Sequence, residues 1–258
     1  MSKIVKIKGG IGNQLFQYAF FKFLSSRGFE VELDVSWYHQ VKISNSLTKR
    51  ELYLNKILNN FPKISNHKTS IKDKILSYKS EKLQSYFAKK DIFYTDFFDG
   101  YWQDIFYAKF LNLDDLNYEI INKKTDLPEK YYVMHTRYGD FKRSKVHCCL
   151  PDSYYLDNIE SFKDHPIYVL TDDYDHTNKI LKKINKKTQI LKTNEIDAFK
   201  IIYNAHGGIS SNSTFCWWPI FLSKNFNWIM PKSWLKNRDI YKSNVYIKGT
   251  KVKNDVQQ

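Results

Sequence analysis

Between residues 131 and 231 the chain alternates short apolar runs with amphipathic segments, and this rhythm restricts the possible folds more than any other feature of the sequence. Four runs have the length and apolar content of strands: YYVMHTR (131–137), PIYVLTDD (166–173), TQIL (188–191) and NWIMP (227–231). Helices are expected between them, from about Pro151 and Asp152 and over 176–186, 196–205 and 213–224. Strands that alternate with helices predict an α/β fold with a mostly parallel sheet covered on both faces.

The first part of the chain opens with the same rhythm. Strand-like residues 4–8 lead into a glycine turn, a helix is expected over 14–26, and FEVELDV (29–35) is typical of a second strand. The pattern then weakens, and residues 40–95, rich in Lys, Ser and Asn, are expected to form short helices and loops. We expect two domains of nucleotide-binding type that face each other across a cleft, one over 1–125 and one over 126–258.

The charge of the chain favours anionic partners. With 41 basic and 27 acidic residues the formal net charge is +14, which suits nucleic acid, an acidic membrane surface or phosphorylated substrates. The lysines are scattered, however, and no zinc-finger spacing, basic zipper or RNA-recognition signature accompanies them. Most of this charge is therefore expected on a solvated surface.

Cysteine usage and hydropathy bear on the compartment. The cysteines Cys148, Cys149 and Cys216 make no disulfide framework, because the first two are adjacent. No run approaches the ~18 consecutive apolar residues that a membrane span needs, and MSKIVKIKGG lacks the apolar core of a signal peptide. We therefore expect a cytoplasmic protein that can touch the inner membrane through its basic surface.

The segment KIKGGIGNQLFQYAF (6–20) has the strand–glycine–helix form that presents backbone N–H groups to a phosphate. It is not a dinucleotide fingerprint, since Leu15 stands where a third glycine would follow Gly10 and Gly12. A P-loop is excluded as well, because no Gly-Lys-Ser/Thr follows. What remains is a tight turn before a helix.

Two side-chain amides stand at the head of that helix. Asn13 and Gln14 can exchange hydrogen bonds with a ligand there. The alternative is a plain strand-to-helix turn in which Asn13 is the N-cap. Glu32 and Asp34 lie near the place where a ribose-binding acid would follow a turn of this kind.

The segment HTRYGDF (135–141) ends the strand that begins at Tyr131, and carboxyl ends of parallel strands are where open α/β sheets bind ligands. Arg137 offers a permanent charge and a fork that fits phosphate oxygens in pairs. His135 points to the same side of the strand. The alternatives are a core histidine at 135 and a salt bridge from Arg137 to Asp140.

The segment SSNSTFCWWP (210–219) gathers small donors at a helix start, where the helix dipole and free N–H groups attract an anion. The donors are Ser211, Asn212, Ser213 and Thr214, and the aromatic residues that anchor the helix are Phe215, Trp217 and Trp218. The alternative is an ordinary N-cap followed by core aromatic residues.

Acidic residues follow the strand at 166–173. Asp173 and Asp175 match the short acidic signature with which some sugar-nucleotide transferases hold a divalent metal, although a loop rich in Asp produces this match by chance. Asp172, at the strand end, suits recognition of a base edge or a ribose at least as well.

Taken in order, GGIGNQLFQYAF, GYWQD, HTRYGDF, VLTDD and SNSTFCWW resemble segments of the bacterial α-1,2-fucosyltransferases, glycosyltransferase family 11. The resemblance runs from about residue 3 to 235, with a poorly matching stretch at about 40–90. It implies a GT-B-like fold with two Rossmann-like domains, in which 1–125 with the glycine loop is the acceptor side and 126–258 binds the nucleotide sugar. It also implies a GDP-fucose donor, inversion at the anomeric carbon, and neither metal nor other cofactor.

The resemblance also implies roles for the candidate residues. Arg137 would contact the diphosphate with His135 beside it, and Asp172 would help to place the nucleoside. Closure over the phosphates would fall to Ser213, Thr214 and Phe215, next to Asn212. The pyrophosphate or fucose would be approached from the other domain by Gly10, Gly12 and Asn13, next to Gln14.

Two positions depart from the family pattern. The family usually has a second arginine directly after the first, and here that position is Tyr138. One cation for the leaving group is therefore missing, so donor affinity is expected to be weaker or to be met partly by a lysine. Cys216 replaces the usual serine, a small change on a helix that we expect to be packed.

The resemblance implies transfer of L-fucose from GDP-fucose to the 2-hydroxyl of a terminal galactose, on a surface-glycan precursor such as an O-antigen or capsule unit that can be lipid-linked. Inversion needs a base for the acceptor hydroxyl, and Asp140, His135 and Glu32 are candidates. Three alternatives stay open: a transferase of another sugar or linkage on the same scaffold, a basic nucleic-acid-binding protein, and a nicotinamide-dependent oxidoreductase built on the glycine turn.

Overall fold

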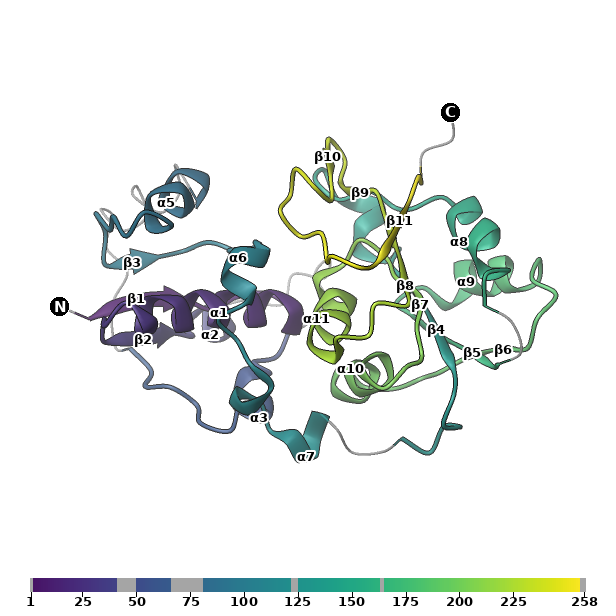
Figure 1. Ribbon diagram of the computed structural model, residues 1–258, viewed down its shortest axis with the longest axis horizontal. Coiled ribbons are helices and arrows are strands. Elements are labelled where there is room, and N and C mark those ends of the chain that lie inside the picture. The colour runs from purple at the N-terminus through teal and green to yellow at the C-terminus, as the bar shows by residue number, and fades with distance from the viewer. Residues whose placement is uncertain (1, 41–49, 66–80, 122–124, 163–164, 256–258) are drawn as a thin grey trace. The chain divides into compact units, whose positions relative to one another are not determined.

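The computed structural model of the chain describes residues 2–40, 50–65, 81–121, 125–162 and 165–255 (Figure 1). They form two compact units, Met1–Asn117 and Tyr118–Gln258, each with a parallel sheet of its own. The sequence analysis placed the boundary between residues 125 and 126. The short helices and loops that it expected over 40–95 lie partly outside the described residues.

Unit 1, Met1–Asn117, is built on a parallel sheet with the strand order β2-β1-β3. The strands are β1 (Lys3–Lys6), β2 (Val31–Asp34) and β3 (Phe97–Phe98). The long helix α1 (Ile11–Ser26) is accompanied by short elements: α2 (Trp37–Gln40), α3 (Leu54–Ile57), α5 (Glu81–Ala88), α6 (Ile105–Ala108) and the 3-10 turn η1 (Leu113–Asp115). Because β2 and β3 flank β1, the strand order reverses between β1 and β3, and such a point is where open sheets bind ligands.

Helix α1 begins at Ile11 rather than at residue 14. Gly10 is its N-cap, and the Gly10 carbonyl oxygen accepts hydrogen bonds from the backbone N–H groups of Asn13 and Gln14, both at 3.0 Å. Both side chains therefore lie in the first turn of the helix. The alternative in which Asn13 is the N-cap is wrong.

Aromatic rings join α1 to the segment that follows β3. Phe20 of α1 stacks on Trp102 with ring centroids 3.9 Å apart and meets Tyr107 edge-on at 5.0 Å. All three side chains are fully buried or nearly so. Phe97, Phe98 and Trp102 of the aromatic segment 94–104 thus supply much of the core of unit 1, where each buries a large apolar area.

Gln17 connects the carboxyl ends of β1 and β3. Its fully buried side chain accepts a hydrogen bond from the Lys8 backbone N–H at 2.9 Å and donates one to the Gly100 carbonyl at 3.1 Å. The two strand ends are therefore held together through a side chain of α1. Nothing in the sequence analysis singled this residue out.

Unit 2, Tyr118–Gln258, holds a six-stranded parallel sheet with the order β11-β8-β7-β4-β5-β6. Its strands are β4 (Tyr132–Thr136), β5 (Ile167–Thr171), β6 (Thr188–Ile190), β7 (Gly208–Ile209), β8 (Trp228–Pro231) and β11 (Lys251–Lys253). Numbered along the chain, this order is 3-2-1-4-5-6, which is that of a Rossmann-type, doubly wound sheet. The predicted α/β fold with a parallel sheet is confirmed, and the arrangement of two domains across a cleft stays a prediction.

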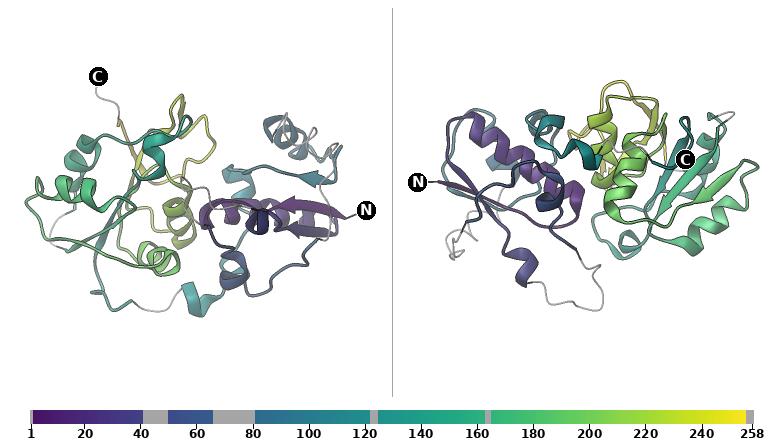
Figure 2. Two further views of the ribbon diagram at one scale, coloured as in Figure 1. Left: turned by 180° about the vertical axis from the view of Figure 1, so that it is seen from behind. Right: turned by 90° about the horizontal axis from the view of Figure 1, so that it is seen from below.

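The helices of unit 2 cover both faces of its sheet (Figure 2). They are α7 (Tyr118–Ile121), α8 (Asp152–Ile159), α9 (Tyr174–Leu181), α10 (Glu195–Tyr203), α11 (Thr214–Ser223) and the 3-10 turn η2 (Asp140–Arg143). Residues of α8 and α9, among them Tyr155 and Ile180, form one buried cluster with Met134 of β4 and Val169 of β5. The hairpin β9 (Ser233–Leu235) and β10 (Arg238–Asp239), and strand β11, were not expected from the sequence.

No helix in the described parts of the chain is both long enough and apolar enough to cross a membrane.

Replacing Gln17 with methionine tests the link between the strand ends. The variant keeps the side-chain volume but loses both hydrogen bonds, so we expect the free energy of unfolding to fall by about 2 kcal/mol, measured by urea denaturation. The control is Gln189→Met in β6, where the side chain is exposed and the expected change is below about 0.5 kcal/mol. An equal effect of the two substitutions would remove the structural role given to Gln17.

Candidate functional site

The strand order of unit 2 reverses between β4 and β7, and two of the predicted segments meet there. Met134 of β4 pairs with Ile209 of β7. One residue further along β4, the imidazole Nδ1 of His135 lies 2.8 Å from the hydroxyl of Ser211. The structure thus brings HTRYGDF and the serine-rich segment before α11 to the same edge of one sheet, the edge at which open α/β sheets bind ligands.

Arg137 is held at this edge by two carboxylates. Its terminal nitrogens lie 2.7 Å from Asp140 Oδ1 and 3.0 Å from Asp172 Oδ2, and its guanidinium carbon is 5.4 Å from the ring centroid of Phe141. The salt bridge to Asp140 that the sequence analysis left open is therefore present. The Nε atom of Arg137 is buried and has no hydrogen-bond partner. This leaves one guanidinium donor without the bond that a buried N–H group normally makes.

Asp172 shapes the turn that carries Arg137. Its Oδ1 accepts a hydrogen bond from the Tyr138 backbone N–H at 2.8 Å, while Oδ2 contacts the guanidinium. A Cβ atom added to Gly139 would come within 2.4 Å of Asp172 Oδ2, so a side chain here would displace the Asp172 carboxylate. Asp172 is thus a positioning residue for the turn in this geometry, and contact with a nucleoside stays a prediction.

Tyr138, the residue directly after Arg137, points into the protein. Its side chain is buried within the cluster under α8 and α9, and its hydroxyl contacts Asp152 at 3.4 Å. Burial, with the nearby Asp152 carboxylate, raises the pKa of Tyr138 far above its usual value. The ammonium group of Lys142 lies 5.9 Å from the centroid of the Tyr138 ring and donates a hydrogen bond to Asp173 at 2.5 Å.

His135 is buried, and its ring stacks on Phe215 with centroids 5.5 Å apart. Burial, assisted by the charge of Arg137, lowers the pKa of His135 to about 3. The imidazole is therefore neutral at physiological pH and is a weak base. The alternative that the sequence analysis left open, a histidine in the core, fits these surroundings.

The start of α11 is held by side chains on both sides. Ser213 is the N-cap and accepts a hydrogen bond from the Phe215 backbone N–H at 3.3 Å. The amide nitrogen of Asn212 donates to the carbonyl oxygens of Cys148 at 2.9 Å and Trp234 at 3.2 Å, which ties two loops to the helix start. Asn212 Oδ1 is buried and has no hydrogen-bond partner.

Thr214 and Phe215 are partly exposed at this helix start, whereas Cys216 is fully buried. The thiol of Cys216 donates to the carbonyl oxygens of Ser211 and Ser213 at 3.4 and 3.3 Å. Burial raises the pKa of Cys216 to about 11, so the group remains a thiol and supplies the donor that a serine would supply.

In unit 1 the predicted residues of the glycine turn have different environments. Gly10 caps α1, Gly12 is buried, and Asn13 Oδ1 accepts a hydrogen bond from Gln103 Nε2 at 3.0 Å. Gln103 belongs to the segment GYWQD, to which the sequence analysis gave no individual role. A Cβ atom on Gly10 would lie 3.4 Å from the guanidinium of Arg50, a residue that the sequence did not point to at all.

Gln14 is a clamp. Its buried amide donates to the carbonyl oxygens of Gly9 at 3.0 Å and Glu51 at 2.7 Å, and it accepts from the backbone N–H groups of Tyr53 at 2.8 Å and Leu54 at 3.2 Å. These bonds use both donors and both acceptor positions of the amide. Gln14 therefore holds the loop before α3, and a ligand contact from it would require one of the four bonds to break.

Two further acidic candidates, Glu32 and Asp173, are engaged elsewhere. Glu32 lies 2.5 Å from Lys63, and this hydrogen bond lowers the pKa of Glu32. Asp173 is the N-cap of α9, where it accepts from the His176 backbone N–H at 3.0 Å. No group of three His, Cys, Asp or Glu side chains that could hold a metal occurs within the described ranges.

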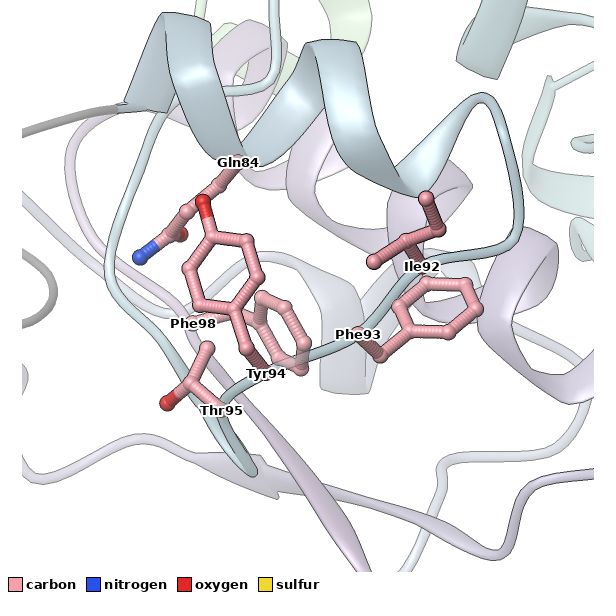
Figure 3. A pocket seen from close by; sticks show the side chains of 6 residues that line it. All are labelled: Gln84, Ile92, Phe93, Tyr94, Thr95 and Phe98. Carbon is pink, nitrogen blue, oxygen red and sulfur yellow. The ribbon is translucent and has the colours of Figure 1, made fainter.

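The hollow under α5 lies apart from these groups. It is lined by Gln84, Ile92, Phe93, Tyr94, Thr95 and Phe98, most of them apolar or aromatic (Figure 3). None of these residues was predicted to act on a ligand, and none carries a charge. The candidate site is therefore the carboxyl edge between β4 and β7.

The neutral state of His135 has a measurable consequence. Its folded-state pKa of about 3 lies below the unfolded value of 6.5, so the unfolded chain binds one more proton between these pH values. We expect stability to fall as the pH drops below about 6.5, by up to ~1.4 kcal/mol per pH unit from this group. His135→Gln should flatten the slope, and the exposed His206→Gln should leave it as in the wild type. Equal slopes for wild type and His135→Gln, from urea denaturation at each pH, would refute the assignment.

No family model matches the chain. An α-1,2-colitosyltransferase from Escherichia coli is 27% identical to it over 286 residues, which cover 92% of this chain and 93% of that protein. No solved structure matches. The similarity to the bacterial transferase thus extends over nearly the full length of both proteins.

Proposed function

We propose that this protein is a glycosyltransferase that moves L-fucose from GDP-fucose to the 2-hydroxyl of a terminal galactose, with inversion and an α-1,2 linkage. The main support is the meeting of Arg137 and the serine-capped start of α11 at one edge of the unit 2 sheet, where His135 contacts Ser211 at 2.8 Å. The similarity to a bacterial α-1,2-glycosyltransferase supports the reaction class and the linkage. The acceptor is a surface-glycan precursor.

The physical requirement of the reaction fits these groups. Breaking the bond between fucose and phosphate leaves positive charge on the sugar and negative charge on the departing GDP. Arg137 and the N-terminus of α11, around Ser213, Thr214 and Phe215, stabilise that anion without a metal. One fixed donor of this kind contributes about 3 kcal/mol to transition-state stabilisation, or about a hundredfold in rate.

Arg137 can bind a diphosphate only if one of its present carboxylate partners moves away. Its guanidinium already faces Asp140 and Asp172, so the cluster carries one positive and two negative charges. A diphosphate would be repelled unless the Asp140 carboxylate moves away from Arg137, and the Asp140 side chain is 41% exposed. Released from Arg137, Asp140 is also the best of the three candidate bases, because His135 is a weak base and Glu32 is bonded to Lys63.

The remaining candidate residues take supporting parts in the proposal. Gly10, Gly12 and Asn13 approach the sugar or pyrophosphate, and Asp172 places the nucleoside while it holds the Arg137 turn. Lys142, 5.9 Å from the Tyr138 ring, places a cation close to the position of the missing second arginine. The +14 net charge would let the cytoplasmic enzyme lie against an anionic membrane that carries a lipid-linked acceptor.

A second candidate is transfer of colitose, which the relative's name supports. Colitose differs from L-fucose by the absence of the 3-hydroxyl. A site built to bond that hydroxyl discriminates against the deoxy sugar by up to about 10⁴-fold, whereas an apolar site discriminates weakly. A screen of GDP-fucose, GDP-colitose and other GDP-sugars with galactose-terminated acceptors, with and without EDTA, therefore identifies donor, linkage and any metal requirement together.

A nucleic-acid-binding protein would instead be stabilised by oligonucleotides and not by GDP, in a thermal-shift titration.

Arg137→Ala tests the leaving-group role. We expect kcat to fall at least about a hundredfold, because a fixed donor to the departing diphosphate is lost, while the circular dichroism spectrum stays that of the wild type. The matched control is Arg143→Ala, which removes an exposed arginine from the same loop. Near-normal turnover of Arg137→Ala would take this residue out of the mechanism.

A further inference from the structure

The carboxyl ends of β1 and β3 in unit 1 display an exposed aromatic ring. Tyr101 is 41% exposed, two residues beyond Asp99, and the ammonium of Lys8 lies 4.8 Å from its ring centroid. The strand order of unit 1 reverses between β1 and β3, so this ring stands at the edge where such a sheet binds a ligand.

The backbone under Tyr101 is held unusually firmly. The carboxylate of Glu81 accepts hydrogen bonds from the backbone N–H groups of Tyr101 at 3.0 Å and Trp102 at 2.8 Å. Trp102 has a φ of 52°, a left-handed conformation that is uncommon for a bulky residue, and its ring is locked against Phe20. Strain that the surroundings enforce in this way is characteristic of functional positions.

One carboxylate offsets part of the positive charge beside the ring. The ammonium of Lys6 lies 3.0 Å from Asp99, and that of Lys8 bonds to the same carboxylate. Burial alone would raise the pKa of Asp99, but the hydrogen bonds and charges of Lys8 and Lys6 outweigh it, so the pKa lies below its usual value. Two lysines and one ionised carboxylate leave about one positive charge, and the adjacent Asn13–Gln103 amide pair is neutral.

This combination fits a sugar better than a diphosphate. The ring can cover the apolar C–H face of a pyranose, and the lysines, carboxylate and amides offer donors and acceptors to its hydroxyls. We propose that Tyr101 is the stacking platform for the acceptor sugar, with Lys8 and Asp99 binding its hydroxyls. The role of the bound sugar as the acceptor rests on the proposed glycosyl transfer. The sugar-binding site itself does not depend on that proposal.

Kinetics of Tyr101→Ala test the platform. Loss of the ring should raise the KM for the galactoside acceptor at least about tenfold and leave the KM for the GDP-sugar within about twofold, because the contact is made to one substrate alone. Tyr101→Phe, which keeps the ring, should stay close to the wild type. Tyr94→Ala is the matched control, since Tyr94 is 46% exposed in the same unit but precedes β3 and lies under α5 (Figure 3). An unchanged acceptor KM, or equal rises for both substrates, would overturn the proposal.

Direct binding separates this inference from the proposed reaction. Saturation-transfer NMR with methyl β-D-galactopyranoside, without donor, should show contact in the wild type and in Arg137→Ala but not in Tyr101→Ala. If no GDP-sugar is turned over and this pattern still appears, the proposed reaction fails and the sugar site stands. If the wild type shows no contact, or Tyr101→Ala keeps it while folded, the sugar site fails.

Discussion

The pairing of β7 with β4 is the constraint on which the candidate site depends. Chain order alone would place β7 beside β6, yet the strand crosses the sheet and bonds to β4, so that Met134 lies next to Ile209. This crossing sets Ser211 beside His135 and aims the start of α11 at the strand end that carries Arg137. Residues 76 positions apart in the sequence thus share one edge of one sheet.

At that edge Arg137 is oriented by its neighbours and is not surrounded by further positive charges in the described part of the chain. A side chain at Gly139 would displace the Asp172 carboxylate, and Tyr138 is anchored in the core. These contacts and the two carboxylates that Arg137 faces orient its guanidinium at the strand end. An arginine that is already oriented loses little freedom when an anion arrives, which favours catalysis by preorganised charge over tight binding of the ground state.

Local sequence patterns predicted much of this and stopped where side chains act over long distances. The alternation over 131–231 predicted β4, β5, β6 and β8, and the strand-end rule drew attention to His135 and Arg137. The sequence pointed Gln14 at a ligand and did not single out Gln17, because an amide in an apolar helix looks the same whether it bonds to a ligand or to a backbone 83 residues away. The two-residue strand β7 and the strand β11 escaped because neither has an apolar run of its own.

The two sheets offer the same kind of site with different charge. In unit 2 the strand-order reversal carries a guanidinium and the start of a ten-residue helix, both suited to an anion. In unit 1 the equivalent position carries two lysines that Asp99 neutralises in part, a pair of amides and an exposed ring on a strained backbone. Under the proposed transfer, the charged donor would be held at the first of these points and the neutral, hydroxyl-rich acceptor at the second. Similar topology therefore leaves the division between the substrates to a few side chains, which is where a change of sugar specificity would act.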